Sequence, residues 1–198
     1  MQIPVELATS DLLMLTAAYL LGSVSSAVLV CQLLQLPDPR NAGSQNPGAT
    51  NVWRTGSHRA GFITLLADIL KGALPVFLAQ QLQFAPDTIA LSALAAMLGH
   101  LFPIYSRFRG GKGVATFIGS CITLEPLLAL YQIVLWLLLI KLFRRSSLAS
   151  ICTALTTVPL CYLLSPANLA VLSLMALLVI GRHHRNIRQL LQGTETSL

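Results

Sequence analysis

Two polar, glycine-rich segments interrupt a chain that otherwise consists mostly of Leu, Ala, Val and Ile. The first covers residues 41–54 and contains Ser44, Asn46 and Arg54. Its small polar residues favour tight turns whose backbone N–H groups face inward, and such turns bind anions. The planar guanidinium of Arg54 can grip two oxygens of one phosphate. The segment therefore predicts a phosphate-binding loop.

The second segment covers residues 107–116 and contains the run Gly110-Gly111-Lys112-Gly113 immediately before an apolar stretch. Glycines let the backbone approach a ligand, Lys112 adds a compact positive charge, and the start of the next helix favours an anion. The run fails the pattern of a nucleotide P-loop, because Ser106 stands where the first glycine belongs and Gly113 replaces the magnesium-binding Ser or Thr. We therefore expect a second anion-binding loop, but not a site for a nucleoside triphosphate.

Further ionisable side chains lie near or inside the apolar stretches. His183 follows the last of these stretches, with Asn186 close behind, and its imidazole could act as a general base near neutral pH. Asp68 and Lys71 lie three residues apart within the second stretch, where lipid disfavours charge, so they should face the protein interior. They could pair with each other or bind a ligand, and both a structural and a catalytic role stay open. His100 could cap a helix or orient the loop that follows it.

The composition is that of an integral membrane protein. Of 198 residues, 55% are hydrophobic and 10% are charged, and the mean hydropathy is +0.71. The four cysteines lie in apolar stretches without CxxC spacing, which indicates small hydrophobic filler rather than a disulfide or a metal site. The basic residues gather at the ends of apolar stretches instead of covering a soluble face, so nucleic acid is not an expected partner. No linker divides the chain, and residues 1–198 are expected to form one domain.

Seven apolar stretches can be drawn, and the fourth is too short for an ordinary crossing. A transmembrane helix needs about 20 residues. If all seven cross with the N-terminus outside, the basic groups fall on the cytoplasmic side and the acidic residues of the loops lie outside, as the positive-inside rule requires. If the fourth stretch instead dips and returns, the basic groups after it fall outside. We therefore predict an all-α bundle of seven transmembrane helices, with the N-terminus outside and the C-terminus cytoplasmic. The stretches are 10–34, 60–82, 88–105, 113–124, 127–141, 148–164 and 167–181.

Two finer expectations follow from this threading. The fourth stretch should borrow turns from the glycine loop and lie tilted or in a thinned region of the bilayer. The first stretch carries small residues from Gly22 to Ala27, which would let another helix approach closely. The N-terminus lacks the basic region of a signal peptide, so this first stretch is expected to remain as a span.

The polar residues resemble, in order and over nearly the whole chain, the PlsY family of bacterial acyl-phosphate:glycerol-3-phosphate acyltransferases. Departures are mild: Gln45 stands where the family usually has Gly, and Arg109 where it often has Lys. The matching residues are Gly22-Ser23 with Ala27; Gly43-Ser44 through Arg54; Asp68 with Lys71-Gly72; Gly99-His100 with Phe102-Pro103; Gly110 through Thr116; Ser147 through Ser150; and His183 with Asn186-Ile187 and Gly193-Thr194-Glu195.

This resemblance implies transfer of a fatty acyl group from acyl phosphate to the 1-hydroxyl of sn-glycerol 3-phosphate, without a cofactor or a metal. The products would be lysophosphatidic acid and inorganic phosphate. The enzyme would lie in the bacterial inner membrane, with its site at the cytoplasmic face among membrane lipids. The sequence does not specify an oligomeric state. The residues implied to line the site are Ser44, Arg54, Lys112, Ser147, His183 and Asn186, with Asn46 and the glycines Gly110, Gly111 and Gly113 beside them, and with Asp68, Lys71, His100 and Glu195 in support.

The hypothesis for the mechanism is direct attack within a complex of both substrates. Arg54 and Lys112 would hold phosphates, and N–H groups of the glycine loop would polarise the acyl carbonyl. Either His183 or a substrate phosphate oxygen would accept the hydroxyl proton. An acyl-enzyme on Ser44 is less favoured, because the sequence places no base near it. The alternative function is a small transporter of a phosphorylated solute, but the apolar segments show no clear paired halves.

Overall fold

The computed structural model describes residues 7–55 and 57–197, which form ten α-helices and two short 3-10 helices without any strand. Each of the seven predicted apolar stretches contains at least one helix, so the all-α class is confirmed. The helices are α1 (Thr9–Gly22), α2 (Ser26–Leu33), α3 (Ala49–Arg54), α4 (His58–Gln81), α5 (Pro86–Leu101), η1 (Ile104–Ser106), α6 (Val114–Leu124), α7 (Pro126–Phe143), α8 (Ser146–Leu164), η2 (Pro166–Asn168), α9 (Leu169–Arg182) and α10 (His184–Leu191).

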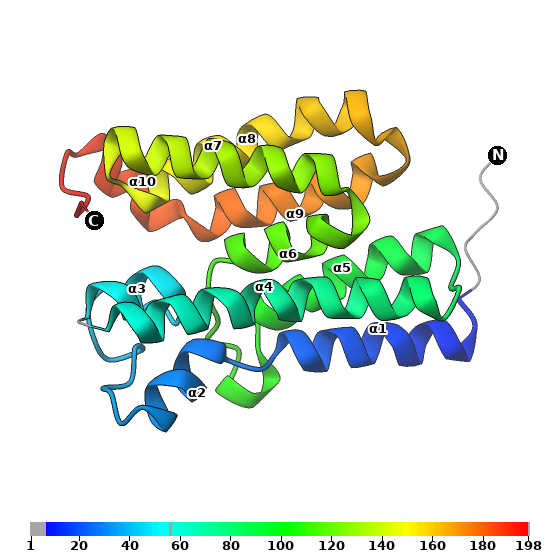
Figure 1. Ribbon diagram of the computed structural model, residues 1–198, viewed down its shortest axis with the longest axis horizontal. Coiled ribbons are helices and arrows are strands. Elements are labelled where there is room, and N and C mark those ends of the chain that lie inside the picture. Colours follow the sequence, from blue (N-terminus) through cyan, green and yellow to red (C-terminus); the bar gives the residue numbers. More distant parts are fainter. Residues whose placement is uncertain (1–6, 56, 198) are drawn as a thin grey trace.

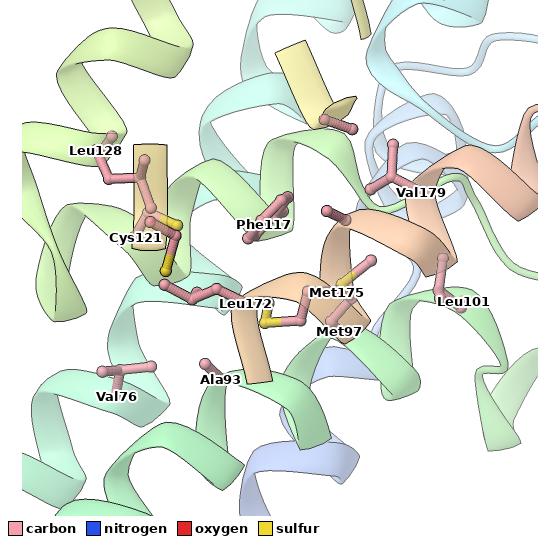
Figure 2. Close-up of a cluster of buried hydrophobic side chains, with 14 residues drawn as sticks. Val76, Ala93, Met97, Leu101, Phe117, Cys121, Leu128, Leu172, Met175 and Val179 are labelled. Carbon is pink, nitrogen blue, oxygen red and sulfur yellow. The ribbon is translucent and has the colours of Figure 1, made fainter. Parts of the chain in front are cut away.

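The long helices form two layers with α6 between them. Helices α1, α4 and α5 lie together on one side, and α7, α8 and α9 lie together on the other (Figure 1). Figure 2 shows side chains from α4, α5, α6, α7 and α9 meeting in one buried hydrophobic cluster around the middle of α6. Because α6 contributes to this cluster and contacts both layers, it joins the two halves of the molecule.

Glycines set how closely the helices cross. A Cβ atom added at Gly72 of α4 would lie 2.1 Å from a backbone oxygen of α6, and one at Gly119 of α6 would lie 2.0 Å from a backbone oxygen of α4. Helices α1 and α5 cross in the same way through Gly22 and Gly99, with 2.0 Å and 2.2 Å. Such small residues let helix backbones approach closely in membranes. The expectation that the first stretch permits close approach is therefore confirmed at Gly22.

Four to six elements are long and apolar enough to cross a membrane. Helices α4, α7 and α8 qualify alone, and so does the segment Pro86–Ser106. The pair α1 and α2 is bent by 44°, and the segment Pro166–Arg182 meets α10 at 56°, so each pair counts only if it forms one broken span. Many large apolar side chains along these helices are exposed, as expected where lipid covers them. The protein is therefore a multi-pass membrane protein, while the count of seven crossings and the orientation of the termini stay predictions.

Helix α6 differs from the expectation for the fourth stretch. It begins at Val114 and has 11 residues, which span about 16 Å against a hydrocarbon core of about 30 Å. Gly113 before it has a φ of 84°, in the left-handed region, and this conformation stops the helix from extending backwards. The glycine loop therefore adds no helical turn, and the expectation that α6 borrows turns from it was wrong.

The polar segments gather at one end of the bundle. The link from α2 to α3, the starts of α4 and α8, and helix α10 all lie at the left-hand end of Figure 1. At the opposite end, acidic side chains accept hydrogen bonds between neighbouring helices and links: Thr88 donates to Asp11 at 2.9 Å, and Asn168 donates to Glu125 at 2.8 Å. The chemistry predicted from the sequence must therefore take place at the first end.

Candidate active site

A chain of hydrogen bonds joins four of the predicted site residues. The Nζ of Lys112 donates to Oδ1 of Asn186 at 2.6 Å, and Nδ2 of Asn186 donates to both carboxylate oxygens of Glu195 at 3.0 Å. The hydroxyl of Ser147 also donates to Glu195, at 2.7 Å. Both Ser147 and Glu195 are buried. The loop before α6, the start of α8 and the C-terminal segment thus meet in one polar cluster.

Arg54 brings the first polar segment to the same place. It is the last residue of α3, and its Nη2 donates to the backbone oxygen of Thr196 at 2.9 Å. Its Nε is buried and has no hydrogen-bond partner among the described residues. A buried donor of this kind strongly favours gaining an acceptor. Arg54 can therefore still donate to an oxygen of a bound anion.

His183 lies at the break between α9 and α10 and is buried. Its Nδ1 is 2.7 Å from the backbone oxygen of Val179. A carbonyl oxygen only accepts hydrogen bonds, so Nδ1 carries the proton and the lone pair of a neutral ring lies on Nε2. Burial favours this neutral form most, and the positive charges of Lys112 and Arg182 add to the effect. The geometry therefore gives His183 the free lone pair that a general base needs.

The glycine loop is held against the end of α5. The N–H of Gly111 donates to the backbone oxygen of His100 at 3.1 Å. A Cβ atom added at Gly111 would lie only 2.2 Å from Nε2 of the same histidine. His100 thus orients the loop that follows it, as one of the two sequence expectations proposed. The absence of a side chain at Gly111 lets the loop lie directly on the imidazole.

Arg182 holds the other side of the glycine loop. Its Nε donates to the backbone oxygen of Gly111 at 3.1 Å, and its Nη2 donates to that of Gly110 at 2.8 Å. Its guanidinium carbon also lies 5.5 Å from the ring centroid of Phe102, within the range of a cation–π contact. The sequence analysis did not single out Arg182, which is one of the basic residues at the ends of the apolar stretches. Its position directly before His183 was the one signal that could have drawn attention to it.

Asp68 and Lys71 form a buried ion pair behind the glycine loop. The distance from Nζ of Lys71 to Oδ1 of Asp68 is 2.9 Å, and Nδ1 of His100 lies 3.6 Å from the same carboxylate oxygen. Lys71 also donates to the backbone oxygen of Val24, which the break between α1 and α2 exposes, at 2.9 Å. This group, the break and the glycines Gly110 and Gly111 line one narrow recess. Because both charges already have protein partners, this geometry favours the structural interpretation of the pair.

Ser44 and Asn46 lie in a loop that Asn51 organises. The buried amide of Asn51 accepts from the N–H of Ser44 at 2.8 Å and donates to the backbone oxygens of Pro39 and Ala42 at 2.8 Å and 3.0 Å. The Ser44 side chain is exposed and that of Asn46 is half-buried. Within the described ranges, no hydrogen bond joins either side chain to Lys112 or Arg54. The sequence analysis did not single out Asn51, whose role depends on contacts within the folded loop.

The site carries excess positive charge. Burial is the main cause that brings the pKa of Lys112 down to about 8; the carboxylate of Glu195 opposes this shift, and the charges of Arg54 and Arg182 add to it. Three cations and one carboxylate leave a net charge of +2, and such a concentration attracts anions. These features define an all-helical membrane protein with a positively charged polar site, beside a neutral imidazole, at one end of its bundle.

Comparison with known proteins gives the family. A family model described as glycerol-3-phosphate acyltransferase matches residues 12–193. This chain belongs to that family, the PlsY acyltransferases, and the protein is an acyltransferase enzyme.

The similarity covers almost the whole chain. A glycerol-3-phosphate acyltransferase of Thioalkalivibrio sulfidiphilus is 50% identical over 91% of this chain and 90% of its own length. One of Vibrio cholerae serotype O1 is 46% identical over 92% of this chain and 88% of its own. Crystal structures of PlsY, an integral membrane glycerol 3-phosphate acyltransferase, superpose with TM-scores of 0.90 for the glycerol 3-phosphate form and 0.88 for the lysophosphatidic acid form. These are 36% and 34% identical and cover 96% of this chain, and 96% and 95% of their own chains.

Proposed function

We propose that this protein transfers a fatty acyl group from an acyl phosphate to the 1-hydroxyl of sn-glycerol 3-phosphate. The products are 1-acyl-glycerol 3-phosphate (lysophosphatidic acid) and inorganic phosphate, so the reaction is the first step of phospholipid biosynthesis. The PlsY relatives were solved in a glycerol 3-phosphate form and a lysophosphatidic acid form. These two molecules are the acceptor and the product of the proposed reaction.

One observation carries the proposal: two cationic side chains with donors directed to the site lie beside an imidazole with a free lone pair. The charge of Arg54 acts on Lys112, and the charge of Lys112 acts in turn on His183. Both proposed substrates carry a phosphate, so the site must neutralise several negative charges at once. An Arg and a Lys beside a general base are a suitable set for phosphate-bearing reactants.

The chemical step follows from these roles. An oxygen of the glycerol 1-hydroxyl attacks the acyl carbon, forming a new ester bond while the bond from that carbon to the phosphate oxygen breaks. The hydroxyl proton passes to Nε2 of His183 or to an oxygen of a substrate phosphate, and inorganic phosphate leaves with its electron pair. Acyl phosphate is a mixed anhydride, so phosphate is a good leaving group. Arg54 and Lys112 stabilise the developing charge, and N–H groups of the glycine loop polarise the acyl carbonyl.

Direct transfer is preferred over an acyl-enzyme on Ser44. A serine nucleophile needs a base within hydrogen-bond reach of its hydroxyl. The Ser44 side chain is exposed, and no histidine or carboxylate is hydrogen-bonded to it in the described part of the chain. Ser44 and Asn46 are therefore assigned to substrate binding, where their loop would close over the phosphates. Asn186, Ser147 and Glu195 hold Lys112 in place.

The membrane supplies the donor. Helix α6 begins further inside the bundle than the start of α4 and the last turn of α7. The glycine loop before α6 is therefore set back from this end of the molecule (Figure 1). A site set back in this way lies nearer to the hydrocarbon region of the bilayer, where the acyl tail of the donor would be. By the positive-inside rule the site faces the cytoplasm of a bacterial inner membrane, from which the soluble glycerol 3-phosphate can enter.

Phosphate release from purified protein tests the proposal. Enzyme in detergent micelles with acyl phosphate and glycerol 3-phosphate should release inorganic phosphate and form lysophosphatidic acid. Lys112→Ala should lower the rate by about 100-fold, the scale for removing a group that stabilises transition-state charge. Lys141→Ala, at an exposed residue of α7, is the matched control and should keep the wild-type rate.

Three outcomes would count against the proposal. If the wild-type protein releases phosphate no faster than acyl phosphate hydrolyses spontaneously, the acyl phosphate reaction is excluded, and if Lys112→Ala keeps the wild-type rate, the role of Lys112 is wrong. If labelled acyl chain becomes bound to the protein without glycerol 3-phosphate, and Ser44→Ala abolishes this labelling, transfer proceeds through an acyl-enzyme instead.

A further inference from the structure

The peptide group between Gly110 and Gly111 is held at both of its ends. Its carbonyl accepts from Nη2 of Arg182, and its N–H donates to the backbone oxygen of His100. The C=O and N–H of a trans peptide point in opposite directions, and the described chain contains no cis peptide bond. The peptide plane is therefore fixed between α9 and α5.

The next peptide group, between Gly111 and Lys112, is held at one end only. Its carbonyl accepts from Nε of Arg182 at 3.1 Å. By the same trans geometry, the N–H of Lys112 points away from the guanidinium. Among the described residues, this N–H has no hydrogen-bond acceptor, so it remains free to donate to an oxygen of a ligand. Its direction is determined by the contact that Arg182 makes with the opposite end of the peptide.

We propose that Arg182 is a positioning residue, which turns two carbonyls of the glycine loop away from the site so that the N–H and the side chain of Lys112 face the substrates. This inference rests on the function proposed above. Glycine peptides rotate easily, and without the guanidinium both carbonyl dipoles could turn toward the bound phosphates and repel them. The contact of Arg182 with the Phe102 ring keeps the guanidinium plane in place for both hydrogen bonds.

Arg182 also couples the loop to the proposed base. It is the last residue of α9, and His183 is the next residue, at the break before α10. One local backbone conformation therefore presents the guanidinium to the loop and the imidazole to the site. A lysine cannot replace this arrangement, because a single ammonium lacks the planar fork that spans two carbonyl oxygens.

Turnover of the folded enzyme is the first test. Arg182→Gln should lower kcat by about 100-fold, the effect expected when a reacting group is displaced by about 1 Å. Arg182→Lys should lower it by about tenfold, since the ammonium keeps one of the two hydrogen bonds. Arg185→Gln, at an exposed arginine of α10, is the matched control and should stay close to wild type. A kcat within twofold of wild type for Arg182→Gln, or for Arg182→Lys if the first variant does not fold, overturns the proposal.

Hydrogen–deuterium exchange of residues 107–113 is the second test and does not depend on activity. Arg182→Gln or Arg182→Lys should speed exchange of the Gly111 amide, because its peptide loses one of its two supports, and Arg185→Gln should leave it unchanged. Unchanged exchange in the Arg182 variants would show that the guanidinium does not hold the loop. If the wild type transfers no acyl group but exchange responds as expected, the proposed function fails while the positioning role of Arg182 stands.

Discussion

Lys112 is the residue at which most of the site's interactions meet. Its ammonium donates to Asn186, faces the carboxylate of Glu195 and lies near the charges of Arg54 and Arg182. Burial and the two arginines hold its pKa at about 8, well below that of an ordinary lysine. Its charge is therefore maintained at neutral pH but is lost more easily than usual as the pH rises.

This lowered pKa predicts the pH above which the activity of the enzyme falls. Because the charged form holds phosphate, kcat/KM for glycerol 3-phosphate should fall as the pH rises through about 8. Bound phosphate stabilises the ammonium, so the same limb in kcat should lie at higher pH. The measurement is a pH–rate profile between about pH 6 and 10, corrected for spontaneous hydrolysis of acyl phosphate.

A conservative variant isolates the group responsible. Lys112→Arg keeps its charge over this range, so the falling limb should disappear even though the rate is lower. Lys141→Arg, on the exposed part of α7, should leave the limb in place. An unchanged limb in Lys112→Arg would assign it to a group other than Lys112.

At the scale of the elements, interruptions of helices place the chemistry. The break between α1 and α2 frees the carbonyl that Lys71 binds, and the break between α9 and α10 places His183. The left-handed Gly113 separates the glycine loop from α6. The intact parts of the helices provide rigid crossings, and those between α4 and α6 and between α1 and α5 leave no room for a Cβ atom at their glycines.

Gly119→Ala tests the crossing of α4 and α6. The new Cβ would lie 2.0 Å from the backbone oxygen of Ile69, so α4 and α6 must separate. Overpacking of this kind costs about 1–3 kcal/mol, and the Tm of the purified protein in detergent should fall. Gly181→Ala on α9 is the matched control, because its Cβ meets nothing within 4 Å and should leave the Tm unchanged or slightly raised. Equal Tm values for the two variants would contradict the glycine-dependent crossing.

At the scale of the whole molecule, the site constrains the path of α6. Lys112 before α6 and Ser147 at the start of α8 both connect to Glu195, so the chain leaves and returns to the same end of the bundle. Helix α7 has 18 residues and is long enough to cross. Helix α6 must then carry the chain to the other end in 11 residues, which favours a crossing over a helix that lies on the surface.

Labelling of single cysteines tests the threading. With the four native cysteines replaced, Asp87→Cys should react with a membrane-impermeant maleimide in intact cells. Arg109→Cys and Arg145→Cys, which flank α6 and α7, should react only after the membrane is permeabilised. Labelling of Arg145→Cys but not of Arg109→Cys in intact cells would show that α6 does not cross.

The class of the fold, the positions of the apolar helices and the family could all be predicted from the sequence. These properties depend on composition, on the length of apolar stretches and on the order of short motifs, all of which are local. The sequence also identified Lys112, Arg54 and His183 as candidates for the site, because few other side chains in so apolar a chain can carry charge or move a proton.

The tertiary structure alone decided which of these residues meet and how. Lys112 and Asn186 are 74 positions apart, and their contact depends on the packing of α6 against both layers. The roles of Arg182 and Asn51 depend on backbone carbonyls of distant or irregular segments, which no residue pattern specifies. The sequence also did not predict the breaks in the helices or the left-handed conformation of Gly113, because surrounding contacts set the few dihedral angles that produce them. The sequence therefore supplied the chemical groups, and the folded helices supplied their geometry.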